Sequence, residues 1–187
     1  MMHKSWLLFI INIISFEIGW FASILGAAHG YFWLGPVVIV GLMILHFCLH
    51  KNWTAEIRLF SLCIFIGFGF DSLFIWLGIY EPKRGWLPYP LTTAWLVAMW
   101  VNFAMTLNVS LRRLQHLLSG AVVLGGIAGP LAYYGGHKLQ AMQITEPLLK
   151  NLLLTGLGWA IVTPVLFYLA RILCDKSAQT DIKTSQT

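Results

Sequence analysis

Long apolar stretches separated by short polar segments make up most of this chain. A membrane-spanning helix needs about 20 predominantly apolar residues, each adding a rise of about 1.5 Å. Six stretches fit this template, at residues 5–28, 31–50, 56–79, 91–110, 114–136 and 149–172. The pattern therefore predicts an all-α, polytopic membrane protein folded as a six-transmembrane-helix bundle.

The composition favours the same class of protein. Of the 187 residues, 58% are hydrophobic and only 10% are charged, and the mean hydropathy is +0.76. So few charged residues cannot cover the surface of a water-soluble globule of this size. The net charge of +5 would also suit a nucleic-acid-binding protein, but the basic residues lie at the ends of the apolar stretches. We therefore expect a membrane lipid environment and no nucleic-acid partner.

The basic residues also predict how the bundle is oriented. Eight of them fall on the side of the amino terminus, at Lys4, Lys51, Arg58, Arg112, Arg113, Arg171, Lys176 and Lys183. The other side has four, at Lys83, Arg84, Lys138 and Lys150. Because cytoplasmic loops are enriched in Lys and Arg, both termini are predicted to be cytoplasmic. Residues 1–176 then form a single transmembrane bundle, and the polar residues 177–187 form a disordered cytoplasmic tail.

Two carboxylates interrupt the apolar stretches, Glu17 in the first and Asp71 in the third. At a rise of 1.5 Å per residue they lie about 18 Å and about 21 Å from the cytoplasmic edge. An acidic residue at the centre of a bilayer costs about 2.5 to 3.5 kcal/mol on insertion scales. Such residues usually face a partner, a cavity or a ligand, so the two acids mark a candidate site.

Other polar and aromatic residues extend this candidate site. In the fourth stretch Trp95, Asn102 and Thr106 belong to one stripe at helical spacing, with Asn108 on a neighbouring face. We expect a polar cleft between the first, third and fourth helices. Its candidate residues are Asp71, Glu17, Asn102, Thr106, Asn108, Asn12 and His46. The candidate aromatics for packing against the apolar tail of a ligand are Trp95, Trp100 and Phe103.

Simpler roles compete with these. Polar groups inside a membrane bundle often serve as hydrogen-bonded glue between helices, each contributing about 0.6 to 2 kcal/mol. His46 and His50 have the spacing of metal ligands on a helix, but no third ligand follows at useful spacing, so we expect no metal and no cofactor. Tyr133 and Tyr134 suit an aromatic belt at the membrane surface. The motifs of the common soluble hydrolases, nucleotide-binding proteins and zinc proteases are absent from the sequence.

Many positions together resemble a family of short bacterial inner-membrane proteins that has only a domain-of-unknown-function label. They are Asn12, Phe16, Glu17, Trp20, His46, Glu56, Gly67, Asp71, Ser72, Gly78, Trp100, Phe103, Ala104, Thr106, Leu107, Asn108, Ser110, Leu111, Gly125, Gly126, Gly129, Pro130, Ala132, Tyr133, Gly136, Lys138, Leu139 and Trp159. The resemblance spans nearly all of residues 5–172 and implies a multi-pass protein of the bacterial inner membrane. Family members are similar to proteins encoded near cyclopropane-fatty-acid-type methyltransferases, which implies a lipid-related accessory role. Glutamine is common in the family at the position of Glu17, which makes Asp71 the stronger candidate.

The preferred hypothesis is that the protein binds or processes a lipid-like ligand. Asp71 would then be an acid, a base or a hydrogen-bond anchor, and Asn102, Thr106 and Asn108 would orient the headgroup. One alternative is a small proton-coupled transporter in which Glu17 and Asp71 relay protons. Another is a membrane partner of a lipid-modifying enzyme, docked through stripes of Gly and Ala, and a homodimer is also compatible with the sequence.

Overall fold

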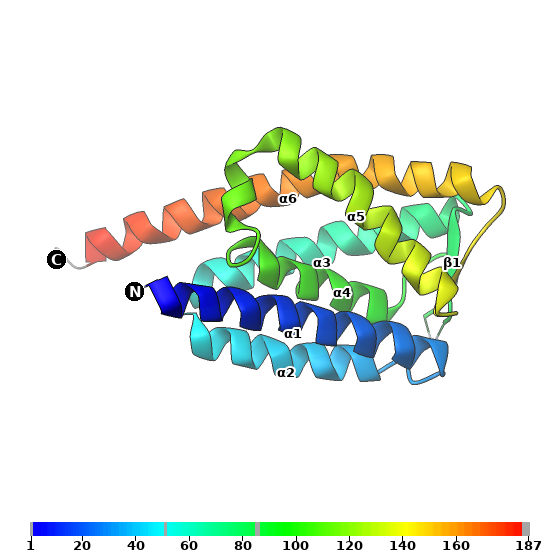
Figure 1. Ribbon diagram of the computed structural model, residues 1–187, viewed down its shortest axis with the longest axis horizontal. Coiled ribbons are helices and arrows are strands. Elements are labelled where there is room, and N and C mark those ends of the chain that lie inside the picture. Colours follow the sequence, from blue (N-terminus) through cyan, green and yellow to red (C-terminus); the bar gives the residue numbers. More distant parts are fainter. Residues whose placement is uncertain (1, 51, 85–86, 185–187) are drawn as a thin grey trace.

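The computed structural model describes residues 2–50, 52–84 and 87–184, which form a helical bundle with a two-stranded sheet at one end (Figure 1). The long elements are α1 (Met2–Ala28), α2 (Leu34–Leu49), α3 (Trp53–Trp76), α4 (Ala94–Leu107), α5 (Leu118–Lys138) and α6 (Leu148–Thr184). The short elements are β1 (Tyr80–Pro82), β2 (Met142–Ile144) and the 3₁₀ helix η1 (Arg112–His116). Each predicted apolar stretch thus overlaps one α-helix.

Four of the described helices are long and apolar enough to cross a membrane. Their spans are Ser5–Ala28, Trp53–Trp76, Leu118–Lys138 and Leu148–Cys174. The helices α2 and α4 are apolar but have only 16 and 14 residues. At 1.5 Å per residue α4 is about 21 Å long, shorter than a hydrocarbon core of about 30 Å.

The short helix α4 lies at the centre of the bundle. It packs against α1, α2 and α3, whereas α5 packs mainly against α6. Every residue of α4 is buried or half-buried. The surrounding helices instead turn large apolar side chains outward, including Phe65 at 75% exposure and Ile161 at 71%. Exposed apolar faces of this extent are expected of helices in contact with lipid, so the structure is that of a membrane protein.

The turn after α3 sends the chain into the sheet. Gly78 has a φ of +67°, and its backbone N–H donates to the carbonyl of Ile75, while the N–H of Ile79 donates to the carbonyl of Phe74. This pair of bonds is a Schellman motif, which needs a left-handed residue and therefore favours glycine. The chain then continues directly into β1, where Tyr80 lies beneath the end of α3.

The strands β1 and β2 pair antiparallel, with Tyr80 opposite Ile144 and Pro82 opposite Met142. The sheet lies at the opposite end of the bundle from the start of α1 and the end of α6 (Figure 1). The sequence predicts only loops at these positions, because three-residue strands are too short for an alternating pattern to be recognised. The sheet joins the connection between α3 and α4 to the connection between α5 and α6.

The last helix is longer than the sequence predicts. It continues through Thr184, beyond residue 172, where the predicted apolar stretch ends, and residues 185–187 lie outside the described part of the chain. After Pro164 no Gly or Pro follows in the sequence to end the helix. The start of α1 and the end of α6 lie at the same end of the bundle (Figure 1).

The close contact between α3 and α4 can be tested at two glycines. A Cβ atom on Gly67 would lie 2.1 Å from Cγ of Trp100, whereas one on Gly69 would meet nothing within 4 Å. We predict that Gly67→Ala lowers the free energy of unfolding by about 1 to 3 kcal/mol through overpacking. The matched control Gly69→Ala should leave it unchanged or raise it by up to about 1 kcal/mol through helix propensity. Thermal unfolding in detergent measures both, and equal stability of the two variants would contradict the packing described here.

Candidate functional site

Asp71 is a fully buried carboxylate that joins four elements of the fold. Its Oδ1 accepts hydrogen bonds from the hydroxyl of Tyr80 at 2.6 Å and from that of Tyr133 at 2.5 Å. Its Oδ2 accepts one from Nε1 of Trp100 at 2.8 Å. The partners come from β1, α5 and α4, while Asp71 itself is on α3. Three donors around one acid form the arrangement suited to an acceptor-only carboxylate.

The local structure explains how the two tyrosines reach Asp71. The turn at Gly78 brings Tyr80 back beneath α3, and burial together with the nearby carboxyl group raises the pKa of Tyr80 well above its usual value. Its hydroxyl therefore keeps the proton that it donates. Tyr133 reaches across from α5, a helix that otherwise packs mainly on α6. The hydrogen bond from Tyr133 is thus a polar link between α5 and the centre of the bundle.

The sequence did not predict these two tyrosines as partners. It favours an aromatic belt for Tyr133, but this side chain is only 7% exposed and points inward. The sequence groups Asn102 with Asp71 in one cleft, but in the structure Asn102 donates to the carbonyl of Phe16 and not to Asp71. Helical periodicity predicts on which face of its helix Tyr133 lies, but it does not predict which other helix that face contacts. The signal that could have identified Tyr133 was its polar hydroxyl in an apolar stretch with few other polar groups.

An aromatic groove lies beside this network, with a cavity volume of about 70 Å³. It is lined by Phe16, Trp20, Ile24, Trp95, Leu96, Met99, Trp100, Phe103, Ala132, Tyr133, Met142 and Trp159. All three aromatics predicted to face an apolar ligand tail are among them. Trp100 stacks on Trp159, with ring centroids 4.8 Å apart and planes at 9°. Trp100 and Tyr133 therefore belong both to the groove wall and to the Asp71 network, and Asp71 lies behind that wall.

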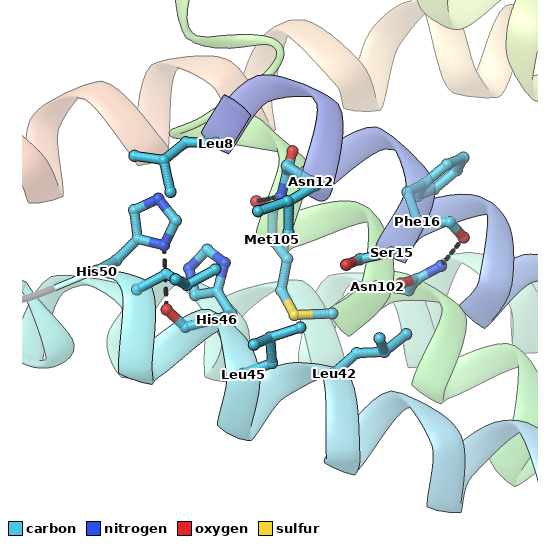
Figure 2. A pocket seen from close by; sticks show the side chains of 12 residues that line it. Leu8, Asn12, Ser15, Phe16, Leu42, Leu45, His46, His50, Asn102 and Met105 are labelled. Atoms are coloured by element: carbon cyan, nitrogen blue, oxygen red, sulfur yellow. Dashed lines mark hydrogen bonds between the residues drawn. The ribbon is translucent and has the colours of Figure 1, made fainter. Parts of the chain in front are cut away.

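Three of the other predicted cleft residues lie around a separate, much smaller cavity between α1, α2 and α4. Its volume is about 20 Å³, and Asn12, His46 and Asn102 line it. In Figure 2, Asn102 lies near Phe16 at one end and His50 near His46 at the other. A cavity of this size accommodates about one water molecule and is too small for a lipid headgroup. The structure thus divides the predicted cleft in two.

The asparagines at this second cavity join α1 to α4. Nδ2 of Asn102 donates to the carbonyl of Phe16 at 2.9 Å, and Nδ2 of Asn12 donates to the carbonyl of Met105 at 3.0 Å. The hydroxyl of Ser110 donates to Oδ1 of Asn12 at 2.7 Å. These are side-chain bonds between neighbouring helices, as in the alternative in which polar residues act as glue.

A buried contact between a histidine and a glutamate occupies the adjoining region. Nε2 of His46 lies 3.5 Å from Oε2 of Glu56, and both residues are 5% exposed. Nδ2 of Asn108 donates to Oε1 of Glu56 at 3.0 Å, and Nε2 of Gln115 donates to Oδ1 of Asn108 at 2.9 Å. Glu56 was not among the predicted cleft residues. It lies in the first turn of its helix, where the helix dipole alone accounts for an acidic residue. The network ties α2, α3 and the segment after α4 together.

Besides Asp71 and Asn108, two further predicted cleft residues, Glu17 and Thr106, line neither cavity. Glu17 is exposed on α1, on the same outward side as Ile13 and Ile18, so it does not meet Asp71. Thr106 donates to the carbonyl of Phe103 within its own helix at 2.6 Å. Among the described residues no group of three His, Cys, Asp or Glu side chains is placed to hold a metal ion.

The comparisons with known proteins show the family. Residues 9–165 match a family described as "Protein of unknown function (DUF2878)". The chain belongs to this family. The resemblance to a family known only by a domain-of-unknown-function label is therefore confirmed. No curated protein and no solved structure matches this DUF2878 chain.

The link from α5 to Asp71 can be tested with two neighbouring tyrosines of this DUF2878 protein. Tyr133 donates to the carboxylate, whereas Tyr134 stacks on His137 and lies beneath the ammonium group of Lys138. A hydrogen bond to a charged group contributes about 1.5 to 3 kcal/mol. We predict that Tyr133→Phe lowers the free energy of unfolding by this amount, whereas Tyr134→Phe, which keeps its ring, changes it by less than about 0.5 kcal/mol. Denaturant unfolding in mixed micelles measures both, and a loss of equal size in both variants would refute the link.

Proposed function

We propose that this DUF2878 protein binds a lipid-like ligand, with an apolar chain of the ligand in the aromatic groove. The observation that carries the proposal is the groove itself, which is walled by tryptophans, Phe16, Phe103 and Met99 and is partly open. Its cavity volume of about 70 Å³ suits a segment of an acyl chain. Clefts that bind small apolar ligands are lined by such side chains.

Rigid walls explain why a lipid would prefer this groove to the surrounding bilayer. Lipid tails are as apolar as the protein side chains, so burial of apolar surface alone gives no preference inside a membrane. The preference must come from close packing against surfaces that are already ordered. The stacked rings of Trp100 and Trp159 provide such a surface, and the hydrogen bond from Trp100 to Asp71 fixes its orientation.

In this proposal Asp71 is a positioning residue. It is fully buried and lines neither the groove nor the small cavity, so it would act on the ligand through Trp100 and Tyr133. The role of acid or base predicted from the sequence requires contact between Asp71 and a substrate, which this position does not favour. A proton relay between Glu17 and Asp71 requires the two side chains to lie close to each other. It loses support because Glu17 is on the outer face of α1.

Two alanines on α5 provide a direct test. Ala132 lines the groove, whereas Ala128 is exposed on the same helix and is not part of the groove lining. We predict that Ala132→Trp fills the groove and lowers labelling by a phospholipid with a diazirine in its acyl chain about tenfold, the size expected for an overpacked contact. Ala128→Trp should keep the labelling of the unmodified protein.

The readout is mass-spectrometric mapping of the labelled residues in protein reconstituted into bilayers. The unmodified protein should be labelled preferentially within residues 16–24 and 95–103, which contribute two walls of the groove. Labelling spread evenly over all exposed helical faces, or equal labelling of the two tryptophan variants, would refute the proposed function.

A further inference from the structure

A basic hollow lies next to the aromatic groove, at the end of the bundle that carries the sheet. It is lined by Glu81, Pro82, Lys83, Arg84, His137, Lys138, Gln140, Met142 and Gln143. Among the described residues, three cationic side chains and one carboxylate line it. Met142 contributes to the linings of both the hollow and the groove, so the two are adjacent at this residue.

Arg84 lines the hollow and has hydrogen-bond donors without a partner in the described part of the chain. Its Nη1 donates to the carbonyl of Leu91 at 2.8 Å, and its guanidinium lies 5.3 Å from the ring centre of Tyr89. Its Nε and Nη2 atoms are buried and have no hydrogen-bond partner among the described residues. Buried donors without an acceptor are rare in proteins, and those of a charged group are the most costly. The planar guanidinium matches the paired oxygen atoms of phosphate or carboxylate.

The other basic side chains of the hollow are held in place by the surrounding structure. Nζ of Lys83 donates to the carbonyl of Ala28 at 2.7 Å, and Nζ of Lys138 lies 5.3 Å from the ring centre of Tyr134. The backbone N–H of Ile144 donates to Nδ1 of His137 at 3.2 Å. This bond makes Nε2 the hydrogen-bearing nitrogen of the ring, so His137 adds a further donor.

From this arrangement we infer that the basic hollow binds a phosphate-type anion, and that the ligand of the protein is an anionic lipid with its headgroup in the hollow and an acyl chain in the groove. The inference rests on the proposed function for the position of the acyl chain. The donors of Arg84 and Lys138 supply the headgroup contacts that the sequence assigned to Asn102, Thr106 and Asn108. Met142 marks the point where headgroup and chain would meet.

The test compares two photoactivatable lipids with the same acyl chains, phosphatidylglycerol and phosphatidylcholine, on the full chain in bilayers. Arg84→Gln and Lys138→Gln each remove one cation from the hollow. Lys150→Gln removes an exposed cation near the start of α6, outside the hollow, and is the matched control. We expect the unmodified protein and the control to be labelled about tenfold more by phosphatidylglycerol, the equivalent of one charge-assisted contact. Each hollow variant should lose this preference.

The outcomes separate the anion site from the groove. Equal labelling of the groove by both lipids in the unmodified protein would overturn the anion site while leaving the proposed function intact. Absence of specific labelling by either lipid would instead refute the groove. Lys138→Gln removes an exposed side chain, so it tests the site even if Arg84→Gln disturbs the loop that ends at Leu91. Preference retained in both hollow variants would also overturn the inference.

Inorganic phosphate identifies the source of the anion. If millimolar phosphate leaves the preference for phosphatidylglycerol unchanged, the hollow takes the headgroup of a lipid. If phosphate reduces labelling by phosphatidylglycerol to the level of phosphatidylcholine, and Lys138→Gln removes this effect, the hollow takes a free phosphate-type anion. Both results support the anion site, and they assign it to different ligands.

Discussion

The hydrogen-bonded carboxylate of Asp71 is the constraint on which the arrangement of this bundle depends. A buried acid is stable only when donors replace its lost water, and here the three donors come from three other elements. Satisfying one side chain therefore fixes the positions of α4, α5 and β1 relative to α3. Because α5 packs mainly on α6, the bond from Tyr133 sets how far α5 stands from the central helix. That spacing determines the width of the aromatic groove.

This constraint connects the polar interior with the proposed ligand site. Trp100 and Tyr133 present their hydrogen-bonding atoms to Asp71 and contribute surface to the groove. An acid that contacts no ligand can thus order the side chains that a ligand would contact. Binding sites in other proteins are supported in the same way, by residues that hold the ligand-contacting side chains in place. The sheet at the end of the bundle has a parallel role, since it carries both Tyr80 and part of the basic hollow.

The sequence predicted much of the fold, because hydrophobic stretches of membrane length are a strong signal for helices. It also predicted Asp71 as an inward residue and grouped Trp95, Trp100 and Phe103, which the structure places along one groove. It could not predict that Tyr133 faces Asp71, since helical spacing does not specify which helices pair. For the same reason Glu17 and Asp71 were grouped although Glu17 faces outward. Asn102 and Asn108 were assigned to a ligand headgroup, but Asn102 donates to the carbonyl of Phe16 and Asn108 to the carboxyl group of Glu56, and no sequence pattern marks either partner.

A double-mutant cycle between Asp71→Ala and Tyr133→Phe tests the central constraint most directly. The free energy of unfolding in mixed micelles would be measured for the unmodified protein, both single variants and the double variant. If the carboxylate holds α5 through Tyr133, the two changes should be coupled by about 1.5 to 3 kcal/mol, the strength of a hydrogen bond to a charged group. Additive effects within about 0.5 kcal/mol would contradict the account.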